Sequence, residues 1–187
     1  MTLLTILLSA CVTTACNPLY SVEQSNVERG YRWVSRGNYT QAISTFQHNL
    51  REYPNSGLGH LGLADAFTAV GQELDAVEMY NKALPLLRAE GHATPENAIG
   101  SAQRIGEKVL SYQNQGLRFP HGVEAYARFR RGVAYEALAK KYPGRANEYT
   151  IAAGEDYTAA QSLAPDWPDP KRRLDCLAGP KRPACKD

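Results

Sequence analysis

The sequence predicts an all-α fold in which helical hairpins stack side by side. One reason is a repeat with a period of 34 residues, because the pattern of small and large apolar residues between Gly30 and Leu87 occurs twice. A second reason is that apolar residues recur at spacings of three and four, as one buried face of a helix requires. A third is that glycine and proline fall where a helix must end. A fixed period of this length is typical of a stacked helix-turn-helix array.

The repeat puts small and large residues at matched positions of two neighbouring hairpins. Small residues such as Gly30 and Ala64 let two helix axes approach to about 8–10 Å, and large residues fill the space beside them. Gly37 and Gly71 come where the first helix of each hairpin must stop, a position that favours left-handed dihedral angles. The matched pairs are Trp33 with Phe67, Gly37 with Gly71, Ala42 with Ala76, Phe46 with Tyr80, Asn49 with Ala83 and Leu50 with Leu84.

These residues resemble the pattern of the tetratricopeptide repeat (TPR) family. The resemblance implies an all-α, TPR-like α-solenoid in which the first helix of each unit lines a concave groove. A generic antiparallel bundle of helices is the alternative. The residues that carry the resemblance are Gly30, Trp33, Gly37, Tyr39, Ala42, Phe46, Leu50 and Pro54, then Ala64, Phe67, Gly71, Ala76, Tyr80, Ala83 and Leu84.

We expect two helices in each of these units and one helix inserted after them. Asn38 is expected to cap the second helix, and Pro54 comes after the end of that helix. A Thr-Pro-Glu sequence then starts the inserted helix, which lacks the repeat pattern. The expected ranges are 22–36, 39–52 and 73–87 for three of the paired helices and 94–113 for the inserted helix. The first helix of the second unit is expected around Leu58, Leu61, Leu63, Ala64 and Phe67.

A third unit matches the repeat pattern less closely than the first two. Gly132 and Ala153 take the places of Gly30 and Ala42, but nine more residues separate them than in the first unit. The sequence assigns these extra residues to a longer turn around 142–145, since doubling the length of a loop costs only about 0.6 kcal/mol. A short helix at 171–177 follows, and its leucines are expected to cover the last apolar face of the array.

The expected domain organisation puts a targeting segment before the array. A signal peptide occupies 1–10 and a tether occupies 11–21. The TPR-like domain covers 22–165, with units at 23–56, 57–90 and 125–165, and a capping helix with a basic tail covers 166–187.

The sequence Leu8-Ser9-Ala10-Cys11 resembles the lipobox of bacterial lipoproteins, in which a peptidase cuts before a cysteine that is then lipidated. Cys11 is the expected lipidation site, and Cys16 is the second choice because no aliphatic residue stands three places before it. The apolar run before Cys11 is too short to span a bilayer, which needs about 20 apolar residues. An ordinary cleaved signal peptide and a buried apolar segment are the alternatives. Lipidation would imply a periplasm-facing lipoprotein of the outer membrane, whereas ordinary cleavage would imply a soluble periplasmic protein.

Two cysteines and several basic residues lie near the C-terminus. In an exported chain an oxidising compartment favours a disulfide between Cys176 and Cys185, with unpaired thiols as the alternative. The basic residues suit contact with lipid phosphates or peptidoglycan, or serve only as a solubilising tail. They are Lys171, Arg172, Arg173, Lys181, Arg182 and Lys186.

Composition and motifs argue against several other classes of protein. A formal net charge of +2 is too small to indicate a nucleic-acid partner. No nucleophile elbow, phosphate-binding glycine loop or zinc-protease motif occurs, so we expect no enzymatic activity, no cofactor and no small-molecule substrate. The four histidines lack metal-ligand spacing, although His60 could face the groove; they are His48, His60, His92 and His121.

The binding surface is the main functional prediction. By the TPR resemblance, mostly apolar groove residues would hold an apolar helix or an extended segment of a partner protein, unless the inserted helix or the tether already fills the groove. We therefore expect a non-enzymatic interaction scaffold of the cell envelope, in pilus, secretion or outer-membrane assembly. An accessory arm or activator of a cell-wall enzyme and a cytosolic TPR adaptor are the alternatives. The predicted groove residues are Gln24, Val27, Tyr31, Val34, Leu58, Leu61, Asp65, Thr68, Ala69, Tyr126, Phe129, Val133 and Glu136.

Overall fold

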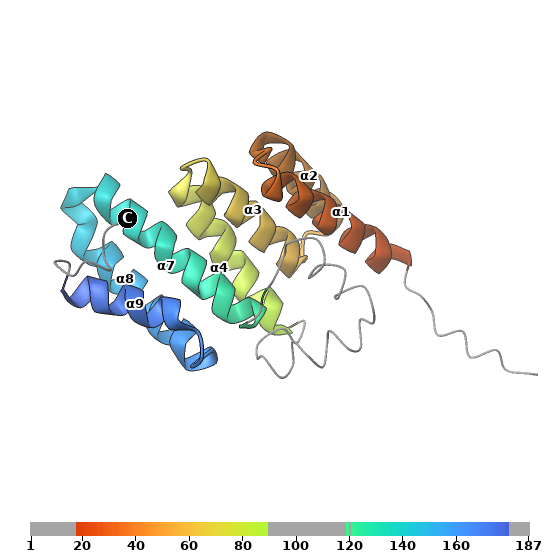
Figure 1. Ribbon diagram of the computed structural model, residues 1–187. Helices are drawn as coiled ribbons and strands as arrows, with labels where there is room; N and C mark the ends of the chain where they lie inside the picture. Colours follow the sequence, from red (N-terminus) through yellow and green to blue (C-terminus); the bar gives the residue numbers. More distant parts are fainter. Residues whose placement is uncertain (1–17, 90–118, 120, 180–187) are drawn as a thin grey trace, which may run out of the picture.

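The computed structural model describes residues 18–89, 119 and 121–179, which form helices packed as antiparallel hairpins (Figure 1). The first hairpin consists of α1 (Pro18–Ser35) and α2 (Tyr39–Glu52), and the second of α3 (Gly57–Ala69) and α4 (Glu73–Ala89). The third consists of α7 (Val123–Lys141) and α8 (Ala146–Leu163), joined through a short 3-10 helix at Pro143–Arg145. A single helix, α9 (Pro168–Ala178), follows. The predicted array of helical hairpins is confirmed.

Each hairpin packs against the next along the array. Helix α2 contacts α3, α4 contacts α7, and α8 contacts α9, while the first helices α1, α3 and α7 also contact one another in that order. Figure 1 shows α1, α3, α7 and α9 following one another along the array. We call the side formed by these four helices the first-helix face.

The start of α1 differs from the prediction. The helix begins at Pro18, four residues before the predicted start at 22. Proline suits the beginning of a helix because its missing N–H would have no helical partner there. The range of α2 is confirmed at Tyr39–Glu52. Asn38 holds the N-cap position, as predicted, but its side chain makes no cap hydrogen bond.

Glycines of two neighbouring first helices make room for one phenylalanine ring. Phe46 of α2 is fully buried, and a Cβ atom at Gly30 of α1 would lie 2.5 Å from its ring. A Cβ atom at Gly62 of α3 would also overlap this ring. In the third unit Gly132 meets Tyr157 in the same way, at 2.6 Å. The predicted fit of small and large residues is therefore present, and the ring of Phe46 contacts two units at once.

The turns inside the first two hairpins have the predicted backbone. Gly37 has a φ of 72° and Gly71 a φ of 74°. Both values lie in the left-handed region, which favours glycine because it has no Cβ atom. The backbone N–H of Gly37 donates to the carbonyl oxygen of Val34 at 2.9 Å, which closes the end of α1.

The prediction that the turn of the third unit holds all nine extra residues is wrong. The turn between α7 and α8 covers only Tyr142 to Arg145 and is one residue longer than the turn between α1 and α2. The remaining extra residues extend both helices by about one turn each, since an α-helix has about 3.6 residues per turn. The third hairpin is therefore longer than the first two and projects beyond them at the turn end.

Buried carboxylates join the second and third hairpins. Glu124 of α7 accepts hydrogen bonds from Nε of Arg88 at 2.9 Å and Nε of Arg128 at 3.0 Å. Asp156 of α8 accepts two hydrogen bonds of 2.7 Å from Arg131, and Arg128 lies 3.5 Å from it. The side chains of Glu124 and Asp156 are only 4% and 3% exposed, so both carboxylates are shielded from water, although Arg88 itself is 52% exposed. They fix α4, α7 and α8 relative to one another.

Helix α9 covers the end of the array, as predicted, but it is longer than the predicted 171–177. It spans Pro168–Ala178, and Leu177 lies next to Gly154 of α8, where a Cβ atom would be 3.9 Å from Cδ1 of the leucine. Cys176 on this helix is disulfide-bonded. Its predicted partner Cys185 lies outside the described residues, so that pairing stays a prediction.

Several other predicted features also lie outside the described residues. They are the signal peptide at 1–10, Cys11, Cys16, the inserted helix at 94–113, His92, and the basic residues Lys181, Arg182 and Lys186.

Candidate functional site

The predicted groove residues divide into a buried group on α1 and α3 and a more accessible group. The buried group lies mostly in the hydrophobic clusters of the first two units, and it comprises Gln24, Val27, Tyr31, Leu61 and Asp65. The half-buried group comprises Val34, Leu58, Thr68, Tyr126, Phe129, Val133 and Glu136, and Ala69 is exposed. Because four of the half-buried residues lie on α7, the accessible part of the first-helix face centres on that helix.

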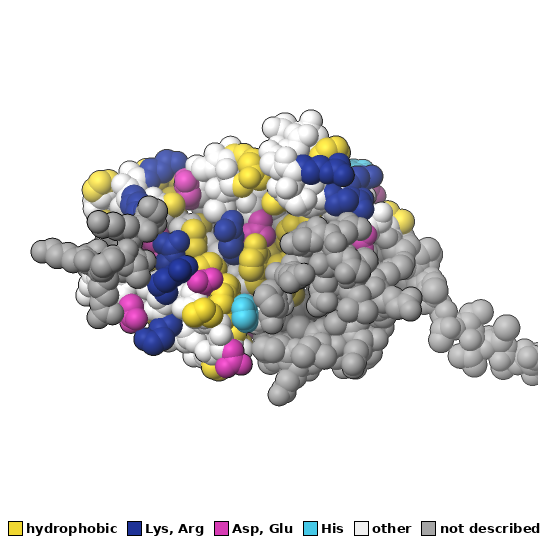
Figure 2. Space-filling view, viewed as in Figure 1, with side chains coloured by type: hydrophobic (Ala, Val, Ile, Leu, Met, Phe, Trp, Pro, Cys, Tyr) yellow, Lys and Arg dark blue, Asp and Glu magenta, His cyan; other side chains and the backbone are white. Residues whose placement is uncertain are grey.

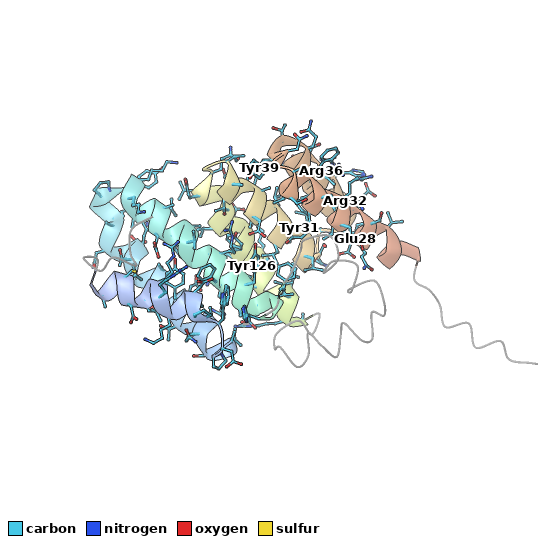
Figure 3. All side chains as sticks on the ribbon, in the orientation of Figure 1. Glu28, Tyr31, Arg32, Arg36, Tyr39 and Tyr126 are labelled. Carbon is cyan, nitrogen blue, oxygen red and sulfur yellow. The ribbon has the colours of Figure 1, made fainter. Side chains whose placement is uncertain are left out.

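Phe119 occupies the space between α1 and α7. This residue precedes α7, and its ring lies 4.8 Å from the ring of Tyr126 and 6.3 Å from the ring of Tyr31. Figure 3 shows Tyr31 and Tyr126 on the same side of the array. The α1 end of the first-helix face is therefore covered in part by the protein's own aromatic side chain. The sequence pattern did not assign Phe119 to this face.

Asp65 of α3 lies at the centre of a polar cluster. Its carboxylate accepts hydrogen bonds from the hydroxyl groups of Tyr80 at 2.7 Å and Tyr126 at 3.1 Å. Nε of Arg130 donates a third, at 3.2 Å. The residue Asp65 is 3% exposed, and the pKa of its carboxyl is raised by burial, against the opposing effects of Arg130 and the two tyrosines. This cluster connects α3, α4 and α7.

A second cluster of the same design lies one unit further along. The hydroxyl of Tyr157 donates to Glu136 of α7 at 2.6 Å, and Nη1 of Arg173 of α9 donates to the same carboxylate at 3.2 Å. Tyr80 and Tyr157 hold the same position of their units, the position of Phe46 in the first unit. In both clusters a buried tyrosine and an arginine of the next first helix thus hold one carboxylate. We call these two clusters the tyrosine–acid–arginine trios.

The trios expose their arginines more than their acids. The side chains of Arg130 and Arg173 are 28% and 31% exposed, whereas those of Asp65 and Glu136 are 4% and 16% exposed. Each trio has a neutral ion pair, but it presents mainly the cation to solvent. Figure 2 shows basic and hydrophobic side chains next to one another on this side of the molecule.

Aromatic residues border the trios. Trp167, in the turn before α9, lies with its ring 4.6 Å from that of Phe129 and stacks on the ring of His121 at 4.9 Å. The ring of Phe129 also lies 5.6 Å from that of Tyr157. The accessible part of the first-helix face therefore combines aromatic rings with two arginines held in place by acids.

The sequence did not predict the trios, although one signal was present. Asp65, Tyr126 and Glu136 were among the predicted groove residues, whereas Tyr80, Arg130, Tyr157 and Arg173 were not. Tyrosine at a core position where the first unit has Phe46 indicates a polar partner, since a buried hydroxyl requires a hydrogen bond.

The described residues were expected to hold no metal site, and His60 was expected to be able to face the groove. No group of three His, Cys, Asp or Glu side chains there is arranged to hold a metal ion. The Nε2 atom of His60 lies 3.0 Å from the carbonyl oxygen of Pro54, and burial lowers the pKa of its imidazole. Among the described helices, none has the length and apolar character to cross a membrane.

The described basic residues near the C-terminus are engaged in ion pairs within the chain. Lys171 pairs with Asp175 at 3.3 Å and Arg172 with Asp169 at 2.8 Å, both on α9 itself. Arg173 belongs to the second trio. Lys171 and Arg172 therefore pair within α9, whereas Arg173 connects α9 to α7.

Comparisons with known proteins give information about the fold. No family model and no curated protein matches the chain. Among solved structures, the first TPR domain of Spaghetti (RPAP3), bound to the HSP90 peptide SRMEEVD, matches with a TM-score of 0.58 and 18% identity, over 83% of this chain and 90% of that one. The first TPR domain of human RPAP3 matches with a TM-score of 0.57 and 18% identity, over 83% of this chain and 89% of that one. The chain therefore has a TPR-like, all-α fold.

Proposed function

We propose that this protein is a non-enzymatic interaction scaffold that binds a peptide segment of a partner protein on its first-helix face. The observation that carries the proposal is the accessible group of aromatic and basic side chains on α7 and α9, centred on Phe129 and Arg130. Aromatic and arginine side chains are the residue types that contribute most to binding at protein interfaces. A structural neighbour with the same fold carries a bound peptide, which supports this use of the array.

Site-specific photo-crosslinking tests this proposal. A benzophenone amino acid at Phe129, on the accessible part of α7, is expected to crosslink to a discrete partner in cells. The same group at Ile151 of α8, which is 55% exposed but does not belong to the first-helix face, is the matched control. Crosslinks to one partner from Ile151 but not from Phe129 would contradict the proposal.

We further propose that the scaffold acts in the bacterial cell envelope as a lipoprotein anchored through Cys11. The lipobox-like sequence before Cys11 supports this location, and so does the disulfide at Cys176, because disulfides persist mainly in oxidising compartments. Assembly of pili, secretion systems or the outer membrane is the process we favour.

Labelling with a clickable palmitate tests the anchor. The wild-type chain is expected to take up the label and to fractionate with the outer membrane, and Cys11→Ala is expected to lose both properties. Cys16→Ala is the control, and it should retain them. Label that persists in Cys11→Ala and disappears in Cys16→Ala would show that Cys16 carries the lipid. The absence of label in the wild-type chain would contradict the proposal of a lipoprotein.

A further inference from the structure

We propose that the exposed side of α1 docks on the phospholipid bilayer that holds the lipid anchor, with Arg29 and Arg36 on anionic headgroups. This inference rests on the proposed lipoprotein anchored through Cys11, and it specifies which surface of the array faces the membrane. It depends on two arginines that lie on one side of α1 and on the short length of chain between Cys11 and the start of that helix.

The chain between the lipid anchor and the array is short. Helix α1 begins at Pro18, so only the residues 12–17 separate it from Cys11. Because an extended chain spans at most about 3.6 Å per residue, the start of α1 lies within about 25 Å of the lipidated cysteine. Figure 1 shows α1 at one end of the array and α9 toward the other end. The link therefore keeps the first hairpin next to the bilayer.

One side of α1 is exposed to solvent along the helix. Its exposed residues follow one another at spacings of three, four and seven, and such residues share one side of an α-helix. This side lies opposite Val27 and Tyr31, which are buried. Its apolar member, Val22, is 50% exposed. We call this side the α1 stripe, and it consists of Val22, Ser25, Arg29 and Arg36.

The charges beside the α1 stripe leave it positive. Glu28 lies next to the stripe, and its carboxylate accepts a hydrogen bond of 3.3 Å from the neutral amide of Gln24. Arg32 also lies next to the stripe, but it is already engaged in an interaction within the chain and is left out of the count. Arg29 and Arg36 then stand against one glutamate, so charge complementarity favours an anionic surface. Figure 2 shows basic side chains at the end of the array where Figure 1 places α1.

The two arginines are positioned by uncharged groups. Nη2 of Arg29 donates to Oδ1 of Asn26 at 2.7 Å, and the guanidinium group of Arg36 lies 5.7 Å from the centre of the Trp33 ring. Neither contact neutralises the guanidinium charge, which pairs well with phosphate oxygens. Tryptophan is itself enriched at membrane–water interfaces, so Trp33 suits a position beside the headgroups.

The lipid anchor supplies the affinity for the membrane, and the arginines select one orientation of the array. A basic side chain near an anionic bilayer favours contact by about fivefold, so the two arginines together favour the docked orientation by roughly twenty-five-fold. Val22 adds an apolar side chain at the boundary between headgroups and acyl chains. The preferred orientation therefore places the first hairpin on the bilayer and the third hairpin away from it.

Fluorescence quenching in vesicles tests this inference with the lipidated full chain and its two native tryptophans. Trp33 lies beside the α1 stripe, whereas Trp167 precedes α9, beyond the third hairpin. The vesicles contain phosphatidylcholine, with or without phosphatidylglycerol, and a lipid that is spin-labelled on its headgroup. Trp33→Phe leaves the signal of Trp167, and the difference from the wild type is the signal of Trp33. Trp33 is expected to be quenched strongly only with phosphatidylglycerol, and Trp167 weakly in both vesicles.

Matched variants locate the contact. Ser25→Glu adds a negative charge at an exposed position of the α1 stripe and is expected to weaken the docked orientation by about fivefold. Arg29→Gln with Arg36→Gln is expected to reduce the quenching of Trp33 to its level without phosphatidylglycerol. The control is Ser162→Glu, at an exposed residue of α8, which makes the same change in charge and should leave the quenching intact. Circular dichroism checks that each variant is folded.

The possible outcomes separate this inference from the proposed function. Lipidation of the wild-type chain with equal quenching of Trp33 in the two kinds of vesicle would overturn the docking and leave the lipoprotein standing. Stronger quenching of Trp167 than of Trp33, or an equal loss of quenching in Ser162→Glu, would also overturn it. The absence of palmitate label in the wild-type chain would overturn both. A benzophenone amino acid at Ser25 that crosslinks in cells to a protein and to no phospholipid would assign the α1 stripe to a protein partner and overturn the docking.

Discussion

At the scale of the residue, the array depends on how single rings and amides fit between helices. The ring of Phe46 lies against Gly30 and Gly62, and therefore sets the distance between the first and second units. Asn49 follows on the same helix at a fully buried position, whereas the equivalent positions in the other units hold Ala83 and Ala160. Within the described residues neither polar atom of the Asn49 side chain has a hydrogen-bond partner.

Gly62→Ala is expected to lower the free energy of unfolding by about 1–3 kcal/mol, because the new methyl group would overlap the rigid ring of Phe46. Urea unfolding followed by circular dichroism measures the change. Gly144→Ala is the control, since no described atom lies within 4 Å of the position that its new methyl group would take, and its φ is not in the left-handed region. A loss of stability at Gly144 equal to that at Gly62 would show that the methyl contact with Phe46 is not the cause.

Asn49→Ala is expected to raise the free energy of unfolding by about 1 kcal/mol, because it removes a buried amide without partners among the described residues. The same denaturation experiment measures it. Asn38→Ala, which changes an exposed residue without a side-chain cap bond, should have little effect. A clear loss of stability in Asn49→Ala would mean that the amide makes a favourable contact that the described residues do not include.

The sequence predicted some of these residue roles and missed others. The period of 34 residues identified Phe46, Tyr80 and their small partners, because matched positions share one packing environment. It did not identify Gly62, which belongs to the next unit, or the arginines of the trios. Those contacts join positions far apart in the chain, such as Asp65 and Arg130, and a single repeat pattern carries no information about them.

At the scale of the element, α7 is the helix that joins the parts of the array. It contacts α4 and α8, and its three arginines pair with acids of α3 and α8 and with Glu124 of α7 itself. The sequence predicted that this helix exists but placed its extra residues in the following turn. Residues 137–141 include alanine and lysine, which both favour helix. The length of α7 is therefore set by the helix propensity of these residues and not by the length of the repeat.

Arg131→Ala is expected to lower the free energy of unfolding by roughly 3 kcal/mol, because it leaves the buried carboxylate of Asp156 with only Arg128, at 3.5 Å. Arg145→Ala removes an exposed pair with Glu148 and is expected to cost less than about 1 kcal/mol. Thermal and urea unfolding of the two variants, measured side by side, compare the two ion pairs. Equal effects would show that burial of Asp156 does not strengthen its pair.

At the scale of the whole molecule, the buried tyrosines of the trios make stability depend on alkaline pH. Burial raises the pKa of Tyr80 and of Tyr157 well above the ordinary value, and the neighbouring carboxylates raise the pKa of both further. The unfolded chain loses these protons near pH 10, whereas the folded chain keeps them. Their contribution to stability is therefore complete below about pH 10 and is lost as the pH rises above it.

The free energy of unfolding is expected to fall above about pH 10 by about 1.4 kcal/mol per pH unit for each such tyrosine. Urea unfolding between about pH 8 and pH 11 measures the slope. Tyr157→Phe should reduce the slope by the contribution of one tyrosine. Tyr142→Phe, at a residue that is 39% exposed, is the control and should leave the slope unchanged. An unchanged slope in Tyr157→Phe would contradict the assignment.

The central claim is that the first-helix face, centred on α7 and α9, binds a partner segment. Hydrogen–deuterium exchange of the full chain, with and without the segment crosslinked from Phe129, tests it most directly. We predict slower exchange in the peptides that cover α7 and α9, and unchanged exchange in those that cover α2. Slower exchange confined to the second helices α2, α4 and α8 would contradict the claim.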